Sequence, residues 1–419
     1  MATSLPNETA TAAVAGRSAR TKDSVMAASV IAAHIVEHIY TRGFVVLIPY
    51  IYSALGLVPI QAGLMEAIRQ LSSGATSICS GILADIYQRR RGQLLALAML
   101  LLGMGYLLVG LAPTYTLILA ALVVGQAGSA LWHPPALGFL AERFPARKGL
   151  LISLHRSTGN IGDSIGPLIV GSLLLAFSWR PVVEMGIPLV LLLSLLIALF
   201  LRPAGTAVAA TVGFRHNLLA QFRLTRESFR GFGMSSLLTV SALRGMADRS
   251  LVLFLPFYLK ENLGMNSVAI GFHVTLLAVL GIVADPIIGS IGDRGGRKHL
   301  IVGIMLMSTV LTSAMILSRG GIGLTLSIAA FGLFFFSVNS LTQAAAIDLA
   351  GGKRLQGTFI GLMWGNNALF SAVSPIVAGV LAKLWGFQAA FYYAAILFFL
   401  GFLVSLSLPA IKPYRLQPA

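Results

Sequence analysis

The chain consists mainly of twelve long apolar stretches, separated by short breaks that are polar or contain glycine and proline. An α-helix needs about 20 apolar residues to cross the hydrocarbon core of a bilayer, and each stretch is close to that length or longer. Charged residues make up only 11% of the chain and mean hydropathy is +0.85, which excludes an ordinary soluble domain. The sequence therefore predicts an all-α membrane protein with twelve transmembrane helices. We place them near residues 26–52, 58–83, 94–112, 116–141, 149–177, 182–201, 233–259, 267–290, 300–318, 322–347, 356–384 and 389–409.

The longest break, residues 203–232, is a basic connector with six apolar stretches on either side. It divides the chain into an N-terminal six-helix bundle, 26–202, and a C-terminal six-helix bundle, 233–409. Polar tails at 1–25 and 410–419 flank the bundles. The N-terminal tail has no apolar core followed by a cleavage site, so we expect no removable signal peptide.

Lysine and arginine are distributed unequally between alternate breaks. Breaks on the side of the N-terminus hold 21 of the 30 basic residues, whereas those on the other side hold 4. The positive-inside rule then predicts a bacterial-type cytoplasmic (inner) membrane protein with both tails in the cytoplasm. The net charge of +16 reports this topology, and no basic patch interleaved with aromatic residues points to a nucleic-acid partner.

The two halves repeat at a nearly constant offset. Gly81–Arg90 ends the second predicted helix and Gly289–Lys298 ends the eighth, 208 residues later. Pro167 in the fifth helix is matched by Pro375 in the eleventh at the same offset. A parallel duplication of six-helix units predicts two pseudo-symmetric bundles, the plan of a transporter whose halves rock around a central site.

The loops that end the second and eighth helices resemble the signature of the major facilitator superfamily, and the resemblance extends over essentially the whole chain. The residues that carry it are Gly81, Asp85, Arg89 and Arg90 in the first loop and Gly289, Asp293, Arg294 and Arg297 in the second. The first loop departs at Ile86 and Gln88, where arginine and glycine are usual. The resemblance implies the major facilitator fold and alternating access, with the loop aspartate pairing with a facing helix in one conformation only. The alternative is a pair of ordinary cytoplasmic turns.

The fifth helix carries Gly162, Gly166 and Pro167, which resemble the Gly-Pro antiporter motif of facilitator-family exporters. Glycine permits close packing and proline frees backbone groups, so this helix either bends during transport or simply packs tightly. The fourth helix lacks the arginine usual in drug exporters. Its segment GQAGSALWHPP, with KGLLISLHRSTGNIGDSIGPL after it, is similar to the fosmidomycin-resistance branch, which implies efflux of phosphonate-like or other small anionic compounds.

Ionisable residues gather in the first helix, in the segment HIVEHIYTRG, where His34, Glu37, His38 and Arg42 lie on one side. A charge at mid-membrane costs roughly 2.5–3.5 kcal/mol on the insertion scale, so these groups should face an interior site.

The seventh helix has its own group of charges, and its Arg249 is the image of Arg42 at an offset of 207. We expect both arginines to converge on a central cavity, with Arg244 and His38 beside them, and to bind a carboxylate, phosphate or phosphonate. The layout resembles the arginine pair of facilitator-family organic phosphate exchangers. The alternative is structural pairing, of Arg42 with Glu37 and of Arg249 with Asp248 or a neighbour.

Coupling to protons requires a group that titrates near neutral pH or a carboxyl brought into that range by burial. The candidates are His34, Glu37, His38, Glu66, Asp163 and Asp248, each of which could instead have a purely structural partner. Glu37 and His38 come first because an anion at Arg42 would change their electrostatics directly. His133, His155 and Arg156, toward the cytoplasmic third of their helices, form a candidate gate or second anion contact, with packing as the alternative.

Other classes of membrane protein fit the sequence less well. The chain has no HExxH segment, no nucleophile elbow and no histidine pairs suited to haem, so no enzyme activity, metal or cofactor is expected. A sensor built on a transporter fold usually adds a soluble domain. We therefore expect a monomeric secondary transporter of a small anionic solute, driven by protons and exporting its substrate. Anion uptake or exchange through the same arginines is the second interpretation.

Overall fold

The computed structural model describes residues 8–144, 147–201, 232–349 and 356–410, and all regular structure in these ranges is helical. The N-terminal half contains α1 (Glu8–Ala54), α2 (Pro59–Ile86), η1 (Gln88–Arg90), α3 (Arg91–Leu111), α4 (Tyr115–Arg143), α5 (Lys148–Leu173), α6 (Trp179–Glu184) and α7 (Ile187–Phe200). The C-terminal half contains α9 (Phe232–Phe257), η3 (Tyr258–Asn262), α10 (Ser267–Gly295), α11 (Lys298–Leu317), α12 (Gly321–Gly332), α13 (Ser337–Leu349), α14 (Gln356–Trp385) and α15 (Gln388–Leu406).

The twelve predicted helices are all present, and two of them are broken. The sixth is divided into α6 and α7 at Met185–Gly186, and the tenth into α12 and α13 at residues 333–336. The seventh, α9, continues into a turn of π-helix, η3. Hydropathy along the chain predicts where an apolar helix lies. The breaks within a helix depend on how it packs against neighbouring helices.

Three predicted helix boundaries differ from the structure by four residues or more, and one of them is the end of the eighth helix, which reaches Gly295 and not 290. The first helix begins at Glu8, inside the predicted 1–25 tail, although its membrane-compatible part starts at Val25. Hydropathy therefore locates the start of the apolar span and not the start of the helix. The fifth ends at Leu173 and not at 177, because the following residues form the turn into α6. Most of the 203–232 connector and of the 410–419 tail lies outside the described residues.

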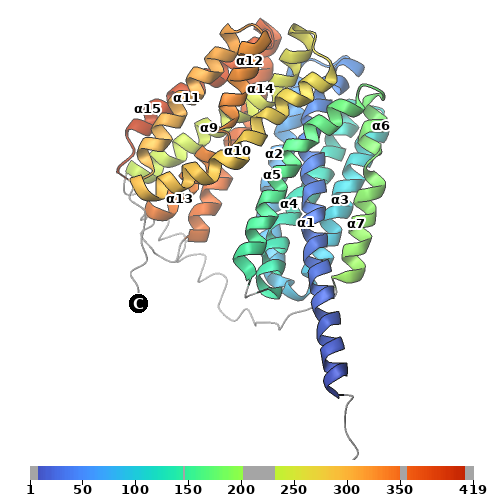
Figure 1. Ribbon diagram of the computed structural model, residues 1–419. Coiled ribbons are helices and arrows are strands. Elements are labelled where there is room, and N and C mark those ends of the chain that lie inside the picture. The colour runs from blue at the N-terminus through green and yellow to red at the C-terminus, as the bar shows by residue number, and fades with distance from the viewer. Residues whose placement is uncertain (1–7, 145–146, 202–231, 350–355, 411–419) are drawn as a thin grey trace, which may run out of the picture.

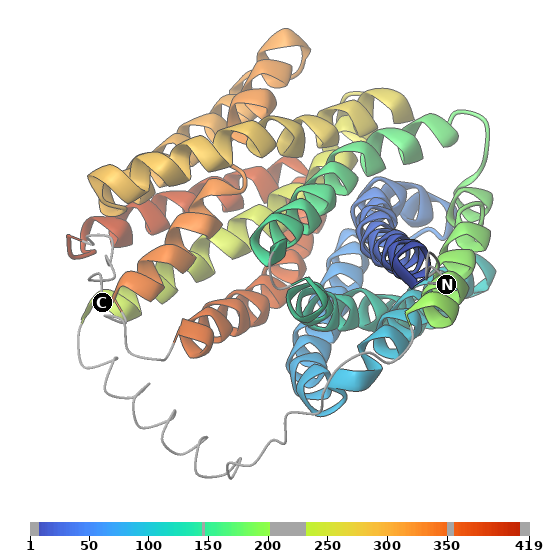
Figure 2. The ribbon, with the colours of Figure 1, turned by 60° about the horizontal axis from the view of Figure 1, so that its bottom comes forward.

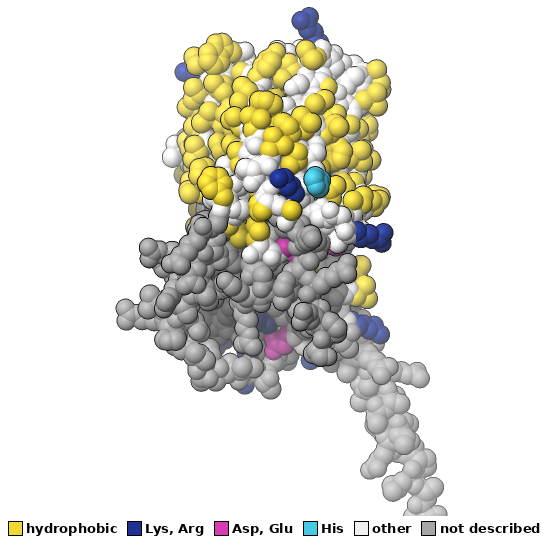
Figure 3. Space-filling view, turned by 90° about the vertical axis from the view of Figure 1, so that its left-hand side faces the viewer, with side chains coloured by type: hydrophobic (Ala, Val, Ile, Leu, Met, Phe, Trp, Pro, Cys, Tyr) yellow, Lys and Arg dark blue, Asp and Glu magenta, His cyan; other side chains and the backbone are white. Residues whose placement is uncertain are grey.

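The exterior of the molecule is apolar enough for a bilayer. Nine helical spans among the described residues are long and apolar enough to cross a membrane. Large hydrophobic side chains are exposed on α11 and α15, including Val310 and Ile396, and Figure 3 shows hydrophobic side chains covering the upper part of one face. The helices that fall short of this apolarity are α2, α5 and α9. All three carry charged residues of the expected site, which lowers their apolarity.

The helices form two bundles, α1–α7 and α9–α15, which stand side by side in Figures 1 and 2. We call the end of the molecule from which α1 projects the N-terminal face and the opposite end the far face (Figure 1). The ribbons of the two bundles diverge toward the N-terminal face. Between the bundles, α2 packs against α14 and α5 packs against α10.

Glycines near the far face bring the two bundles together, and they follow the internal repeat. A Cβ at Gly63 of α2 would collide with the carbonyl oxygen of Pro375, and a Cβ at Gly271 of α10 would collide with that of Pro167. Gly63 and Gly271 are 208 residues apart, as are the two prolines. Gly171 approaches the carbonyl oxygen of Ser267 just as closely. The pseudo-symmetry expected from the sequence is therefore built into the contact between the bundles.

Candidate functional site

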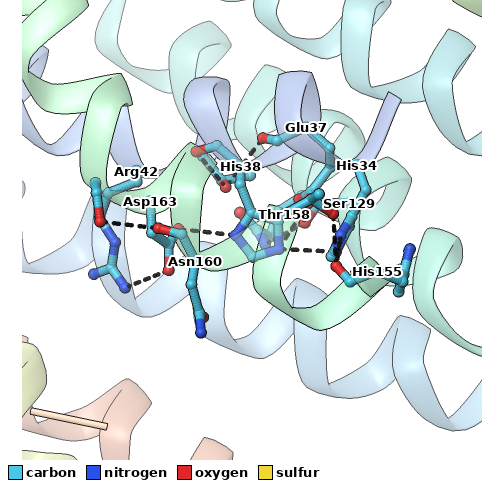
Figure 4. Close-up of polar contacts among 12 residues, drawn as sticks. His34, Glu37, His38, Arg42, Ser129, His155, Thr158, Asn160 and Asp163 are labelled. Atoms are coloured by element: carbon cyan, nitrogen blue, oxygen red, sulfur yellow. Dashed lines mark hydrogen bonds and ion pairs between the residues drawn. The ribbon is translucent and has the colours of Figure 1, made fainter. Parts of the chain in front are cut away.

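Four histidines from three helices of the N-terminal bundle meet in one cluster (Figure 4). His34 and His38 of α1 have their Nε2 atoms 3.1 Å apart. The ring of His155 of α5 stacks on His34 with centroids 3.7 Å apart, and the ring of His133 of α4 lies 5.4 Å from that of His34. Glu37 completes the cluster, with Oε2 3.3 Å from His38 Nε2. We call His34, Glu37, His38, His133 and His155 the histidine cluster.

Every inward-facing group on α1 has a partner on another helix. His34 Nδ1 lies 2.7 Å from the carbonyl oxygen of His155, and His38 Nδ1 lies 2.8 Å from Asp163 Oδ1. The hydroxyl of Ser129 on α4 donates a hydrogen bond to Glu37 Oε1 at 2.5 Å. Glu37 and His34 are both buried. Figure 4 shows these contacts running along one side of α1, as the four-residue spacing predicts.

Glycines of α5 make this arrangement possible. A Cβ at Gly162 would lie 2.6 Å from both His38 Cβ and the carbonyl oxygen of Ile35. A Cβ at Gly159 would lie 2.7 Å from His34 Cε1. Gly166 packs against the backbone of Ile39 in the same way. Within this conformation the glycines of the predicted antiporter motif therefore serve close packing, which seats α5 on the histidine cluster.

The guanidinium of Arg42 lies next to the cluster, toward the other bundle. Its Nη2 pairs with Asp163 Oδ2 at 3.2 Å, so Asp163 bridges Arg42 and His38. Its Cζ lies 5.6 Å from the ring centroid of Phe335, in the break between α12 and α13. Arg244 of α9 approaches the same ring from the C-terminal bundle, at 5.9 Å. Two guanidinium groups from opposite bundles therefore share one aromatic ring.

The remaining charges form a second group between the bundles. Glu66 Oε2 pairs with Arg69 Nη1 at 2.6 Å, and Glu66 Oε1 lies 3.7 Å from Arg249 Nη1 of the C-terminal bundle. Arg244 Nε pairs with Asp248 Oδ2 at 2.5 Å. Glu66 and Arg249 lie seven or eight residues from the far-face ends of α2 and α9, a depth of about 10–12 Å at 1.5 Å per residue.

Both arginines have carboxylate partners, as the alternative of structural pairing allowed, but the pair expected between Arg42 and Glu37 is wrong. Arg42 pairs with Asp163 and not with Glu37, and Arg249 pairs with Glu66 and not with Asp248. The actual partners come from other helices, so spacing along α1 or α9 could not identify them. His133 and His155, expected to form a gate or a second anion contact or simply to pack, both lie in the histidine cluster. Arg156, the third member of that expected gate, is exposed.

The signature loops contain a pair of ionic contacts that the sequence analysis did not single out. Arg297 Nε contacts Asp348 Oδ2 of α13 at 2.5 Å, and its Nη2 contacts Asp293 at 2.8 Å. In the first half, Arg91 Nη1 contacts Glu142 Oε2 of α4 at 2.6 Å. In each of the two contacts that join different helices, the paired residues are 51 positions apart in the sequence. A comparison of the two halves of the chain could therefore have revealed Arg91, Glu142 and Asp348.

Other residues of the predicted motif take less part in contacts. Arg89, Arg90 and Arg294 are exposed, and the side chain of Asp85 lies outside the described part of the chain. A Cβ at Gly81 or at Gly289 would meet open space. In this conformation the motif glycines are therefore not held by packing.

Comparison with known proteins identifies the class of protein to which the chain belongs. Residues 30–369, and again 237–419, match the profile of the Major Facilitator Superfamily. The chain belongs to this superfamily and is an integral membrane transporter of small molecules, not an enzyme.

Particular relatives are distant. The fosmidomycin resistance protein of Escherichia coli strain K12 is 23% identical, with 89% of this chain and 91% of the relative covered. A probable sulfoacetate transporter of Cupriavidus necator is 24% identical, with 85% and 87% covered. The crystal structure of a bacterial homologue of the human lysosomal transporter Spinster, in an inward-facing and occupied conformation, superposes with a TM-score of 0.76 at 13% identity over 91% of this chain and 96% of that one. The last comparison concerns the fold alone.

Proposed function

We propose that the protein moves a small organic anion across the membrane by alternating access and that it works as a proton-driven exporter. The observation that supports an anionic substrate is that the arginines of this site outnumber the carboxylates paired with them. Within the described part of the chain, four arginines pair with three carboxylates: Arg42 with Asp163, Arg244 with Asp248, and Arg69 and Arg249 with Glu66.

Arg249 is the guanidinium left with the weakest compensation. It shares Glu66 with Arg69, whose contact of 2.6 Å is much shorter than the 3.7 Å to Arg249. Its side chain is 39% exposed, whereas that of Arg69 is 6% exposed. A partly hydrated guanidinium with spare donors is suited to the two oxygens of a carboxylate, phosphonate or sulfonate.

Binding between the bundles also provides a means of movement. Arg42 belongs to one bundle and Arg244 and Arg249 to the other, so an anion held by both sets contacts two bodies that can rock. The bundles pack through glycines at the far face. We propose that rocking separates these glycine contacts and closes the opposite end, which would carry the anion from the cytoplasm outward.

Export is supported by the name of one relative, the fosmidomycin resistance protein. We propose the proton as the driving ion and Asp248 and Glu66 as groups that respond to it, because both carboxylates neutralise the arginines assigned to the anion. The other candidates, His34, Glu37, His38 and Asp163, all lie in or beside the histidine cluster.

One observation favours the second interpretation, uptake of an anion together with a proton. Arg244 is already paired with Asp248, so an anion that arrives at Arg244 competes with Asp248. A carboxylate that loses its guanidinium partner in a buried site is most readily neutralised by a proton. Anion and proton would then bind together and travel in the same direction.

Transport into vesicles of known orientation separates the two interpretations. Proteoliposomes containing the purified protein are loaded with a fluorescent pH indicator and offered phosphonates, sulfonates or carboxylates under an imposed proton gradient. Export predicts that substrate and proton cross in opposite directions, and uptake predicts that they cross together. If none of these anions moves a proton or is itself moved, the proposal fails.

A further inference from the structure

We infer that His34, Glu37, His38 and His133 form a binding site for a divalent first-row transition ion, for which Zn²⁺ and Co²⁺ are the probes. The inference stands on the geometry of the histidine cluster and does not rest on the proposed function. It also departs from the expectation, drawn from the sequence, that the chain binds no metal.

Hydrogen bonds determine which ring nitrogens carry protons. The carbonyl oxygen of His155 is only an acceptor, so His34 Nδ1, at 2.7 Å, must be the donor. Asp163 is paired with Arg42 as a carboxylate, so His38 Nδ1, at 2.8 Å, must also be the donor. When both imidazoles are neutral, their Nε2 atoms are therefore bare lone pairs. These lone pairs face each other across 3.1 Å, an arrangement that needs either a proton on one of the two Nε2 atoms or a metal ion between them, and the metal titration described below distinguishes the two.

A carboxylate oxygen faces the same point. Glu37 Oε2 is buried, has no hydrogen-bond donor among the described residues, and lies 3.3 Å from His38 Nε2. Nitrogen and oxygen ligands 2.0–2.1 Å from a tetrahedral ion are about 3.3 Å from one another, close to both separations found here. With His133 included, one ligand atom from each of the four residues lies within 4.8 Å of the others. Small side-chain rotations would complete the tetrahedron.

The three ligands on α1 also have the outer partners that metal ligands have in proteins. A ligating histidine usually donates its other ring nitrogen to a carboxylate or a backbone carbonyl. His38 does so to Asp163 and His34 to the carbonyl of His155, while Ser129 holds Glu37 (Figure 4). Imidazole nitrogens with one carboxylate favour a transition ion over Mg²⁺ or Ca²⁺, which prefer oxygen ligands.

The sequence contains a matching pattern. HIVEH, His34–His38, has the spacing H-x-x-E-H, in which two histidines one helical turn apart bind zinc in some metalloenzymes. The third histidine, His133, comes from α4, far away in sequence. All four ligands belong to the N-terminal bundle, so rocking of the two bundles leaves the site intact. The ion would be resident, fastening α1 to α4.

Metal titration of the purified full-length protein tests the inference. After treatment with a chelator, the protein in detergent is titrated with Co²⁺, whose visible absorption is intense in four-coordinate sites. We expect one Co²⁺ per chain, displaced by Zn²⁺. His34→Gln, Glu37→Gln and His133→Gln should each weaken binding about 100-fold, and Asp163→Asn about 10- to 100-fold through His38. His273→Gln, which alters a histidine on α10 outside the cluster, is the matched control and should bind normally.

The wild-type protein by itself can overturn the inference. Failure to bind Co²⁺ or Zn²⁺ stoichiometrically at micromolar concentration contradicts it, as does a zinc-edge X-ray absorption spectrum without about three imidazole ligands. Loss of binding in His273→Gln equal to that in His133→Gln does so too. These measurements need no substrate, so their failure leaves the proposed transport untouched, and a failed transport assay leaves the metal site standing.

Discussion

Glu66 Oε1 of α2 lies 3.7 Å from Arg249 Nη1 of α9, and this contact joins the two bundles across the centre of the transporter. Glu66 also holds Arg69 at 2.6 Å and accepts a hydrogen bond from Gln70 at 2.6 Å. Arg249 therefore shares the carboxylate of Glu66 with Arg69 and Gln70. An anionic substrate at this position would satisfy Arg249 without leaving Glu66 unpaired, because Arg69 remains in contact with it.

Arginine geometry at the centre can be tested by replacement with lysine. Arg42→Lys and Arg249→Lys keep the charge but lose the fork that binds two oxygens, so each should weaken substrate affinity about tenfold, in line with the loss of one charge-assisted hydrogen bond of about 1.5 kcal/mol. Binding is measured by calorimetry with the anion found in the vesicle assay. Arg319→Lys, in the turn before α12, is the control and should be without effect. Normal transport by both central variants would contradict two-oxygen recognition.

The ring of Phe335 is expected to position both arginines that it contacts. Phe335→Leu removes the aromatic face beneath Arg42 and Arg244 while keeping an apolar side chain of similar reach. A cation–π contact contributes about 0.5–2 kcal/mol, so losing the equivalent of one such contact should lower affinity roughly 2- to 30-fold. Phe335→Trp should retain most of it. Equal affinities for the leucine and tryptophan variants would show that only the bulk of Phe335 matters.

The glycines between the bundles should control the conformational equilibrium. Gly63→Ala and Gly271→Ala place a methyl group against Pro375 and Pro167, which costs about 1–3 kcal/mol in this conformation only. The population should move toward conformations in which the far-face ends of α2 and α14 separate. Spin-label distances between these ends, in a Cys79→Ala background, measure the shift. Gly303→Ala on α11, where a Cβ meets no atom within 4 Å, should leave the distances unchanged.

The two repeated ion pairs at the signature loops should differ in strength. Asp348 is 6% exposed, so Asp348→Ala leaves the buried guanidinium of Arg297 dependent on Asp293, whose side chain is 64% exposed, and should cost about 2–3 kcal/mol. Glu142 is 36% exposed, and Glu142→Ala should cost about 1 kcal/mol or less. Thermal unfolding of the purified proteins in detergent gives the comparison. An equal loss of stability in the two variants would mean that burial does not distinguish the pairs.

Much of the site was accessible from sequence, but its pairings were not. The clustering of charge on α1 follows from the four-residue spacing of His34, His38 and Arg42, which any helix turns into a single face. The partners of that face, Asp163, Ser129 and His155, lie on α4 and α5, and only the packing of those helices decides which atom meets which. The proposed metal ligands could not be grouped from the sequence for a related reason, since His133 enters the cluster from another helix.

By itself, the sequence determined that this chain spans a membrane as twelve helices in two repeated halves, because the length and apolarity of a span are local properties that need no neighbour. The tertiary structure alone decided which charge neutralises which, for an ion pair or a metal ligand requires two atoms within 3 to 4 Å. Such proximity arises from glycine-mediated contacts between helices, as where Gly162 of α5 lies against His38. Arg249 was thereby left with only part of a partner, and the proposed transport of an anion rests on that feature.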